Sequence, residues 1–301
     1  MNLMKYILFV VLLCLALISA SQSDLLFNNY RINAVARNPA AIENNGSINA
    51  YLGIHQQWVG FEDAPNMQWA HVSNFFDKRN MGISLNILSQ SVGATLTQNI
   101  KLGYSYHIFF KGGHNLSLGL GAGLYSRNFD LSKLRFEENE QNNPVSMENE
   151  IHPDFDFGLE YTYQKLTIGL ASNHITILNS KATLFKIPMQ NNVYANYTVG
   201  IIKYVSIIPG INFFNSGTIS SLGVSMDFLY NDLFNAGIAY RSGTSLIIRA
   251  GVKISSSFQF SYSYDMGSGS FTTYNSGVHE VVITARFKKR SESFNSPRFI
   301  D

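Results

Sequence analysis

The 301-residue sequence has a single cysteine, Cys14, which lies inside an N-terminal apolar run. Residues 1–20 have the layout of a secretory signal peptide, with Lys5 before the run of Tyr6 to Ile18 and small residues after it. The run is too short for a transmembrane helix, which needs about 20 apolar residues. It also lacks the small residue before Cys14 that a lipoprotein signal would have. A mature chain without cysteine excludes disulfides, thiol nucleophiles and cysteine-ligated metals.

Charged residues are also scarce, at 14% of the chain against about 25% in typical soluble domains. The net charge of +2 gives no field strong enough to recruit nucleic acid. No run after residue 20 is apolar for long enough to span a bilayer as a helix. Aromatic residues and glycine are plentiful, with 16 Tyr, 22 Phe and 23 Gly. A secreted chain of this composition indicates a β-rich envelope protein.

Apolar and polar residues alternate with a period of two over many segments, for example Leu96–Ile108, Leu116–Leu124 and Asp154–Tyr163. This period is that of a β-strand with two different faces. The polar face is mostly Gly, Ser, Thr and Asn with charges of both signs, whereas a soluble sandwich would carry Lys and Glu there. Several apolar stripes end in Tyr or Phe, as the aromatic girdles of outer-membrane barrels do. The pattern therefore predicts a barrel with a polar lumen and an apolar outer face.

The fold class that we predict is all-β: a transmembrane antiparallel up-and-down β-barrel of about 14 strands. Short turns alternate with long connections such as 128–152, 176–191 and 266–277, and the short side of such barrels is periplasmic. The alternation is weakest at 66–76, 192–204 and 206–214, the last of which contains Pro209. The expected strands are 46–57, 66–76, 80–89, 95–108, 115–127, 153–163, 165–175, 192–204, 206–214, 218–229, 233–241, 244–254, 257–265 and 278–287.

These expectations divide the chain into a signal peptide at 1–20, a barrel at 46–287 and two flanking segments. Residues 21–45 lack clear alternation, and we expect them to be periplasmic or lumenal. Residues 288–301 are too polar for barrel wall and are expected to form a periplasmic tail. The location implied is the outer membrane of a Gram-negative bacterium, with outer-membrane lipid around the barrel.

Motifs of catalysis and metal binding are absent from the sequence. There is no Gly-x-Ser-x-Gly elbow and no His-Glu-x-x-His zinc helix. His279 and Glu280 are adjacent on a strand and so point to opposite faces, while Asp154 and Asp156 share a face that we interpret as lumenal. The acid-rich stretch at 137–150 is best interpreted as solvated surface. We therefore predict no enzyme activity, no cofactor and no metal site.

The stretch HQQWVGFEDAP, residues 55–65, carries a family resemblance. It resembles the Gln-Gln-Trp-x-Gly-Phe-x-x-Ala-Pro signature of the PorP/SprF family of type IX secretion and gliding-motility membrane proteins. Asp63 stands where that family usually has glycine, and Met67-Gln68 replaces its Thr-Gln pair. The matching residues are Gln56, Gln57, Trp58, Gly60, Phe61, Ala64 and Pro65.

Four further landmarks of that family occur in this sequence in the family's order, and the resemblance covers residues 35–287. Val278 replaces serine in the last of them, which otherwise resembles a closing Gly-Ser-His-Glu. The landmark residues are Asn38 and Pro39, Tyr240 and Arg241, Tyr264 and Asp265, and His279 and Glu280.

The resemblance implies a non-enzymatic outer-membrane component that helps to secrete or anchor a surface adhesin. The implied partners are the C-terminal domain of the secreted adhesin and the periplasmic ring or peptidoglycan-linked proteins of the machinery, with no nucleic acid. The polar lumen leaves a second interpretation open, a passive diffusion channel or small-molecule transporter. A lipid-modifying enzyme is a more remote third. For residues 56–65 two roles remain, bracing the first outer loop or docking the partner.

Overall fold

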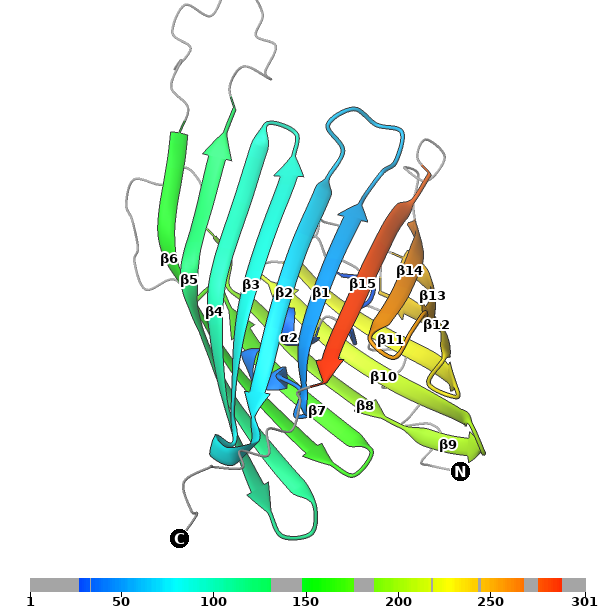
Figure 1. The fold of residues 1–301 in the computed structure, drawn as a ribbon. Helices are drawn as coiled ribbons and strands as arrows, with labels where there is room; N and C mark the ends of the chain where they lie inside the picture. The colour runs from blue at the N-terminus through cyan, green and yellow to red at the C-terminus, as the bar shows by residue number, and fades with distance from the viewer. Residues whose placement is uncertain are drawn as a thin grey trace, which may run out of the picture.

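The structure, a computed structural model, forms an antiparallel β-barrel (Figure 1). The residues it describes are 27–32, 34–130, 148–175, 187–217, 219–242, 245–267 and 276–288. The predicted signal peptide, most of the acid-rich stretch and the tail after Lys288 lie outside these residues.

Fifteen strands make one sheet in which each pairs antiparallel with its neighbours. The sheet closes on itself because β1 pairs with β15, and β10 pairs with both β8 and β11. Since β8 and β9 both lie along β10, they form one interrupted strand of the wall, which gives the 14-stranded barrel predicted from the sequence. The strands are β1 (Ser47–Gln56), β2 (Asn66–Phe76), β3 (Met81–Val92), β4 (Thr95–Phe110), β5 (His114–Phe129), β6 (Glu148–Tyr163), β7 (Leu166–Asn173), β8 (Gln190–Tyr197), β9 (Val199–Ile202), β10 (Val205–Ser216), β11 (Ile219–Tyr230), β12 (Phe234–Arg241), β13 (Ser245–Lys253), β14 (Phe258–Gly267) and β15 (Val278–Lys288).

The three segments with the weakest alternation are all strands. In β10, Pro209 pairs with Met226 on one side, and on the other side the neighbouring strand is interrupted between β8 and β9. The N–H of Thr198 at this break donates to the carbonyl of Lys165 in the β6–β7 turn, 2.9 Å away. Proline has no N–H to donate, so its place beside the break avoids a lost ladder bond.

One end of the barrel has only tight turns, and we call it the turn end. Its connections are 77–80, 111–113, 164–165, 203–204, 231–233 and 254–257. The other end, called the loop end, has the long connections 57–65, 130–147, 174–189 and 268–277 together with three short ones, 93–94, 217–218 and 242–244. This asymmetry is that of outer-membrane barrels, whose short turns are periplasmic.

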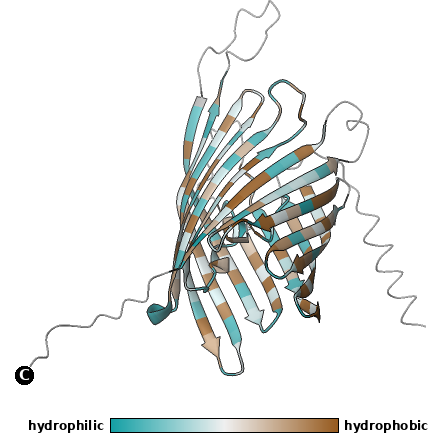
Figure 2. Ribbon diagram, turned by 45° about the vertical axis from the view of Figure 1, so that its right-hand side comes forward, coloured by the Kyte–Doolittle hydropathy of each residue, from teal (hydrophilic) through white to brown (hydrophobic). Residues whose placement is uncertain are grey.

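The two faces of the wall differ as the alternation predicts, and Figure 2 shows the resulting banding of hydropathy along the strands. Outward residues are large and apolar, with Leu102 67% exposed and Leu52 58% exposed. Inward residues of the same strands are buried and polar, such as Lys101 and Asn49. A wall that is apolar outside and polar inside suits a bilayer rather than water. Among the described residues, no helix is both long and apolar enough to cross a membrane.

Residues 27–32 and 34–42, which precede β1, lie inside the barrel, and we call them the lumenal segment. They include the short helix α2 (Ala34–Arg37), which Figure 1 shows within the ring of strands, and the 3-10 helix η1 (Pro39–Ala41). Most side chains of this segment are buried. The barrel lumen therefore contains its own packed core.

Candidate functional site

Glu280 holds the start of the lumenal segment to the last strand. Its carboxylate is fully buried, and it accepts hydrogen bonds from the backbone N–H groups of Asn28 and Asn29, each at 2.9 Å, and from Asn29 Nδ2 at 2.8 Å. His55 Nδ1 lies 2.9 Å from the same carboxylate. A buried carboxylate is costly unless such donors surround it, so this cluster depends on all four contacts being made together.

Arginines of β12 and β13 hold the same part of the segment. Arg249 donates to the carbonyl of Asn28 at 3.3 Å and pairs with Asp227 at 2.9 Å. Arg241 Nη2 lies 3.4 Å from the carbonyl of Phe27, and Nη1 of the same guanidinium lies 3.6 Å from Asp265. Each arginine thus binds both a backbone carbonyl of the lumenal segment and a carboxylate of the wall. Together the two ion pairs connect β11, β12, β13 and β14 to the lumenal segment.

A second anchor is Asn38, at the start of η1. Its Nδ2 donates to the carbonyl of Leu159 and to the hydroxyl of Tyr194, each at 3.0 Å, while its Oδ1 accepts from the N–H of Ala40. The Tyr194 hydroxyl in turn donates to Glu160. Asn38 therefore caps η1 and ties it to two wall strands at once.

Glycines on the wall make room for this turn. A Cβ on Gly158 would lie 2.0 Å from Asn38 Oδ1, and one on Gly119 would lie 2.2 Å from the N atom of Ala40. Both distances are far inside van der Waals contact, so only glycine allows the backbone of residues 38–40 to lie this close. The glycine-rich face of β5 and β6 is thus the seat of the lumenal segment.

Arg37 is buried inside the lumen. Its guanidinium lies over the rings of Tyr30 and Tyr194, 5.3 Å and 6.0 Å from their centroids, and its Nη2 donates to the carbonyl of Tyr30 at 2.9 Å. The carbonyl of Arg37 accepts from Asn173 Nδ2 at 2.9 Å. Burial lowers the pKa of Arg37 from its ordinary value, and the two tyrosines oppose that effect. The stacking partly replaces the water that this cation loses.

Apolar contacts complete the packing. Phe27 lies edge-on to Trp69 with ring centroids 5.4 Å apart, in a cluster that includes Tyr51. Ile42 packs with Phe75 in a second cluster. Together with the polar contacts, these place wall residues against the lumenal segment on all sides of the lumen.

The loop that contains residues 56–65 is joined by backbone hydrogen bonds to both of its neighbours at the loop end. The N–H of Ser276 donates to the carbonyl of Val59 at 3.1 Å, and the N–H of Gly93 donates to that of Asp63 at 3.1 Å. Within the loop, Gln57 N–H donates to the carbonyl of Pro65 at 2.9 Å. Gly60 has a φ of +108°, and Phe61 is 44% exposed.

The predicted landmark residues fall into two groups. Asn38, Pro39, Arg241, Asp265 and Glu280 are inside and contact the lumenal segment or its partners, whereas the other three lie on the outward face. The rings of Tyr264 and His279 lie tilted against each other there with centroids 5.1 Å apart, and His279 Nδ1 lies 2.7 Å from the Tyr262 hydroxyl. The adjacent pair His279 and Glu280 thus points to opposite faces, as the strand geometry predicts.

Several residues of this site were not singled out from the sequence, namely Asn28, Asn29 and Asn173. Each is polar and lies far along the chain from its partner, so neither spacing nor period could identify it. The sequence signal was that residues 21–45 lack clear alternation, which argues against barrel wall but leaves a place in the lumen open.

Elsewhere the lumenal charges pair with each other. Lys101 lies 2.8 Å from Asp154 and 2.7 Å from Asp156, and His174 lies 2.8 Å from Asp154. In the part of the chain that the structure describes, no cluster of His, Cys, Asp and Glu has the arrangement of a metal site.

The fold and the site define an outer-membrane β-barrel whose lumen is filled by its own N-terminal segment. The chain matches the model of the family described as type IX secretion system membrane protein PorP/SprF over residues 19–285, and it belongs to this family. The family and the fold are those of a secretion-system barrel and not of an enzyme. Membership implies contact with other components of that system.

The chain is similar at low identity to solved outer-membrane barrels, and one of these, with a TM-score above 0.5, supports the fold. The toluene transporter TbuX of Ralstonia pickettii is 13% identical with a TM-score of 0.53, over 85% of this chain and 93% of that one. Omp33 of Acinetobacter baumannii is 8% identical with a TM-score of 0.43, over 81% and 99%. A mutant of the Rh. blastica porin is 10% identical with a TM-score of 0.35, over 80% and 99%. No match is found among curated proteins.

Proposed function

We propose that this barrel is a non-enzymatic component of the type IX secretion and gliding machinery that helps to secrete or anchor a surface adhesin. The observation that carries the proposal is the family match over almost the whole chain. The filled lumen supports it, because a barrel that holds its own segment by buried charges is suited to a structural role rather than to open diffusion. The loop end then faces the secreted client, and the turn end faces the periplasmic ring or peptidoglycan-linked proteins.

The site residues have separate parts in this proposal. The landmark residues inside the barrel fix the lumenal segment and so make the barrel rigid. They are Asn38, Pro39, Arg241, Asp265 and Glu280. The loop at 56–65 presents Phe61 at the outer rim, where the C-terminal domain of an adhesin would contact it.

Deletion of the gene tests the proposal. Surface adhesins of the deletion strain are measured by protease shaving of whole cells, and the same proteins are measured in the medium. We expect at least one large adhesin to be lost from the surface and either to accumulate in the medium or to be degraded. Complementation with the wild-type gene is the control. Unchanged secretion and attachment of every adhesin would refute the proposal.

The alternative function is a passive channel or small-molecule transporter, which the polar wall of the lumen favours. The lumenal segment counts against it, since its contacts with the wall include buried hydrogen bonds to Glu280, Arg249 and Asn173. The conductance of the barrel separates the two functions.

A further inference from the structure

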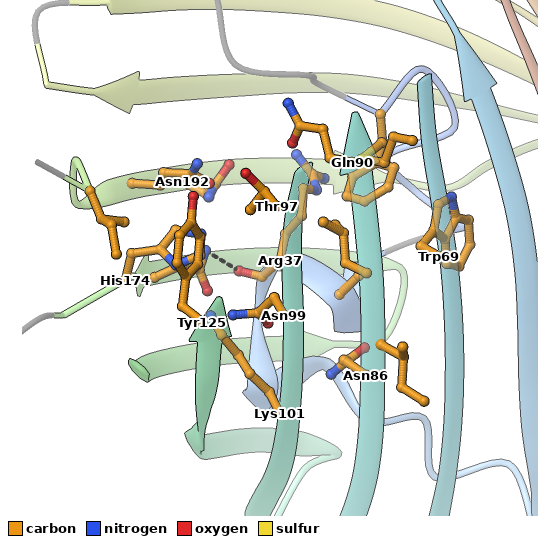
Figure 3. Close-up of a pocket in the computed structure, with 18 of the residues that line it drawn as sticks. Arg37, Trp69, Asn86, Gln90, Thr97, Asn99, Lys101, Tyr125, His174 and Asn192 are labelled. Carbon is orange, nitrogen blue, oxygen red and sulfur yellow. Dashed lines mark hydrogen bonds between the residues drawn. The ribbon is translucent and has the colours of Figure 1, made fainter. Parts of the chain in front are cut away.

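A cavity of about 160 Å³ lies in the lumen on the loop-end side of the lumenal segment (Figure 3). Its walls come from α2 and from the upper parts of β2, β3, β4, β5, β7, β8 and β10. The volume is below the range of about 300–1,000 Å³ that is usual for drug-sized ligands. The occupant that it suits is therefore a single small ring or a group of that size.

The walls are rich in side-chain amides and hydroxyls. Asn86, Gln90, Thr97, Asn99 and Asn192 all line the cavity, and Figure 3 shows them around the same space as Arg37 and Tyr125. An amide offers both donors and an acceptor, which matches a ligand whose groups both donate and accept. Hydroxyl groups on a ring have this property.

Three of the lining residues have unused hydrogen-bonding capacity in the buried state. Asn173 Oδ1, Asn192 Oδ1 and Arg37 Nε are buried and have no hydrogen-bond partner among the described residues. Rotation of the Asn173 amide would break a hydrogen bond, because its Nδ2 donates to the carbonyl of Arg37. The orientation of Asn173 Oδ1 is therefore fixed. Buried polar atoms of this kind are costly unless something satisfies them. Two acceptors and a cationic donor around one small space define a site for a ligand that carries both hydroxyl donors and an anionic acceptor.

The charge of the walls points the same way. Arg37, Lys101 and Arg127 line the cavity, and no carboxylate is among its lining residues in the described part of the chain. Lys101 is already paired with Asp154 and Asp156 behind it, so Arg37 is the cation that a ligand in the cavity would meet. An ammonium-bearing ligand such as an amino acid would meet this cationic wall, whereas a carboxylate would be stabilised by it.

We propose that this cavity binds the ring of an acidic sugar, a hexuronic acid, with its hydroxyls on Asn173 and Asn192 and its carboxylate on Arg37. The sugar reaches the cavity from the loop end, which is the outer side of the membrane. The site shares Arg37 and Asn173 with the contacts that hold the lumenal segment, and it does not rest on the adhesin role.

Saturation-transfer NMR on the purified full-length barrel tests the proposal with D-glucuronate as the probe. The detergent is an amine oxide, because a maltoside headgroup is itself a sugar. We expect transfer to D-glucuronate, and none or at least tenfold weaker binding for D-glucose and for acetate. Equal binding of glucose or of acetate would overturn the proposal, and so would no transfer to glucuronate, since the cavity then holds water only.

The variant Asn192→Ala removes one acceptor and is expected to weaken glucuronate binding about threefold to tenfold, the effect of one hydrogen bond. Asn235→Ala is the matched control, because Asn235 lines a separate lumenal cavity near the turn end. Gel mobility before and after heating checks that both variants form barrels. Equal loss in both variants, or no loss in Asn192→Ala, would overturn the assignment.

A further experiment with oligogalacturonate identifies the source of the ligand. Binding of the oligomer assigns a polysaccharide chain, and binding of the monomer alone assigns a free sugar acid.

Discussion

Glycine at position 158 is required by the close approach of Asn38 rather than by strand geometry. Both landmarks of the Asn-Pro-Ala element could be recognised in the sequence, but their partners could not. Asn38 bonds to Leu159 and Tyr194, which are 121 and 156 residues away along the chain. Local pattern therefore identified the residues of this anchor and left their contacts undetermined.

Gly158→Ala is expected to destabilise the barrel by about 1–3 kcal/mol, the usual cost of overpacking. The added methyl would lie 2.0 Å from Asn38 Oδ1, so either Asn38 or β6 must move. The measurement is urea unfolding of the purified protein. Gly200→Ala is the matched control, because the nearest atom to its added methyl is Lys165 Nζ at 3.8 Å, and we expect no loss there. Equal stability of the two variants would contradict the close approach.

At the scale of elements, the strands could be predicted because the alternation of apolar and polar residues is local. Within each strand it distinguishes the lumen-facing side from the outward side. The strand β10 was also predicted despite Pro209, and the structure shows that the break opposite this proline removes the need for a ladder bond there. The lumenal segment could not be placed in the same way. Its backbone is irregular, and its position depends on contacts such as that of Asn28 with Glu280, 252 residues away.

For the loop at 57–65 two roles remain: its residues brace the loop on the barrel, or they dock the partner protein. Its hydrogen bonds to neighbouring loops come from backbone groups, which survive changes of side chain. Phe61→Ala is therefore expected to leave the barrel folded, with stability within about 0.5 kcal/mol, as for most surface changes. Because Phe61 is exposed at the rim, we expect the same variant to reduce surface adhesin at least threefold.

The adhesin is measured by shaving of whole cells, with Phe110→Ala as the control. Phe110 is 52% exposed and lies at the turn end, so it cannot reach an external client. Full retention of the adhesin by Phe61→Ala would contradict docking. Gly60→Ala tests bracing separately, because its φ of +108° is unfavourable for alanine and a brace would lose stability.

On the scale of the whole molecule, we expect the lumenal segment to control whether the barrel conducts. In planar bilayers we expect the wild-type protein to show no steady conductance of porin size. Glu280→Ala removes the acceptor for Asn28, Asn29 and His55, and loss of one partner of a buried charged cluster costs roughly 3–5 kcal/mol. We expect this variant to show frequent open events as the lumenal segment leaves its seat.

Glu43→Ala serves as the control in the same measurement. Glu43 is 41% exposed and pairs with Arg286 at 3.7 Å, a surface ion pair that contributes about 0–1 kcal/mol. It should remain as closed as the wild type. Ohmic conductance of the wild-type barrel would instead favour the channel function.

The contact between Asn28 and Glu280 also has a consequence for the order of assembly. The lumenal segment is among the first parts of the chain to be made, yet its main acceptor belongs to β15, the last strand. That strand is also the one that pairs with β1 to close the wall. The hydrogen bonds of Asn28 and Asn29 to Glu280 therefore form only when β15 is incorporated, whereas the Asn38 anchor on β6 and β8 does not need that strand. Closure of the wall and the last step in seating the segment thus depend on the same strand.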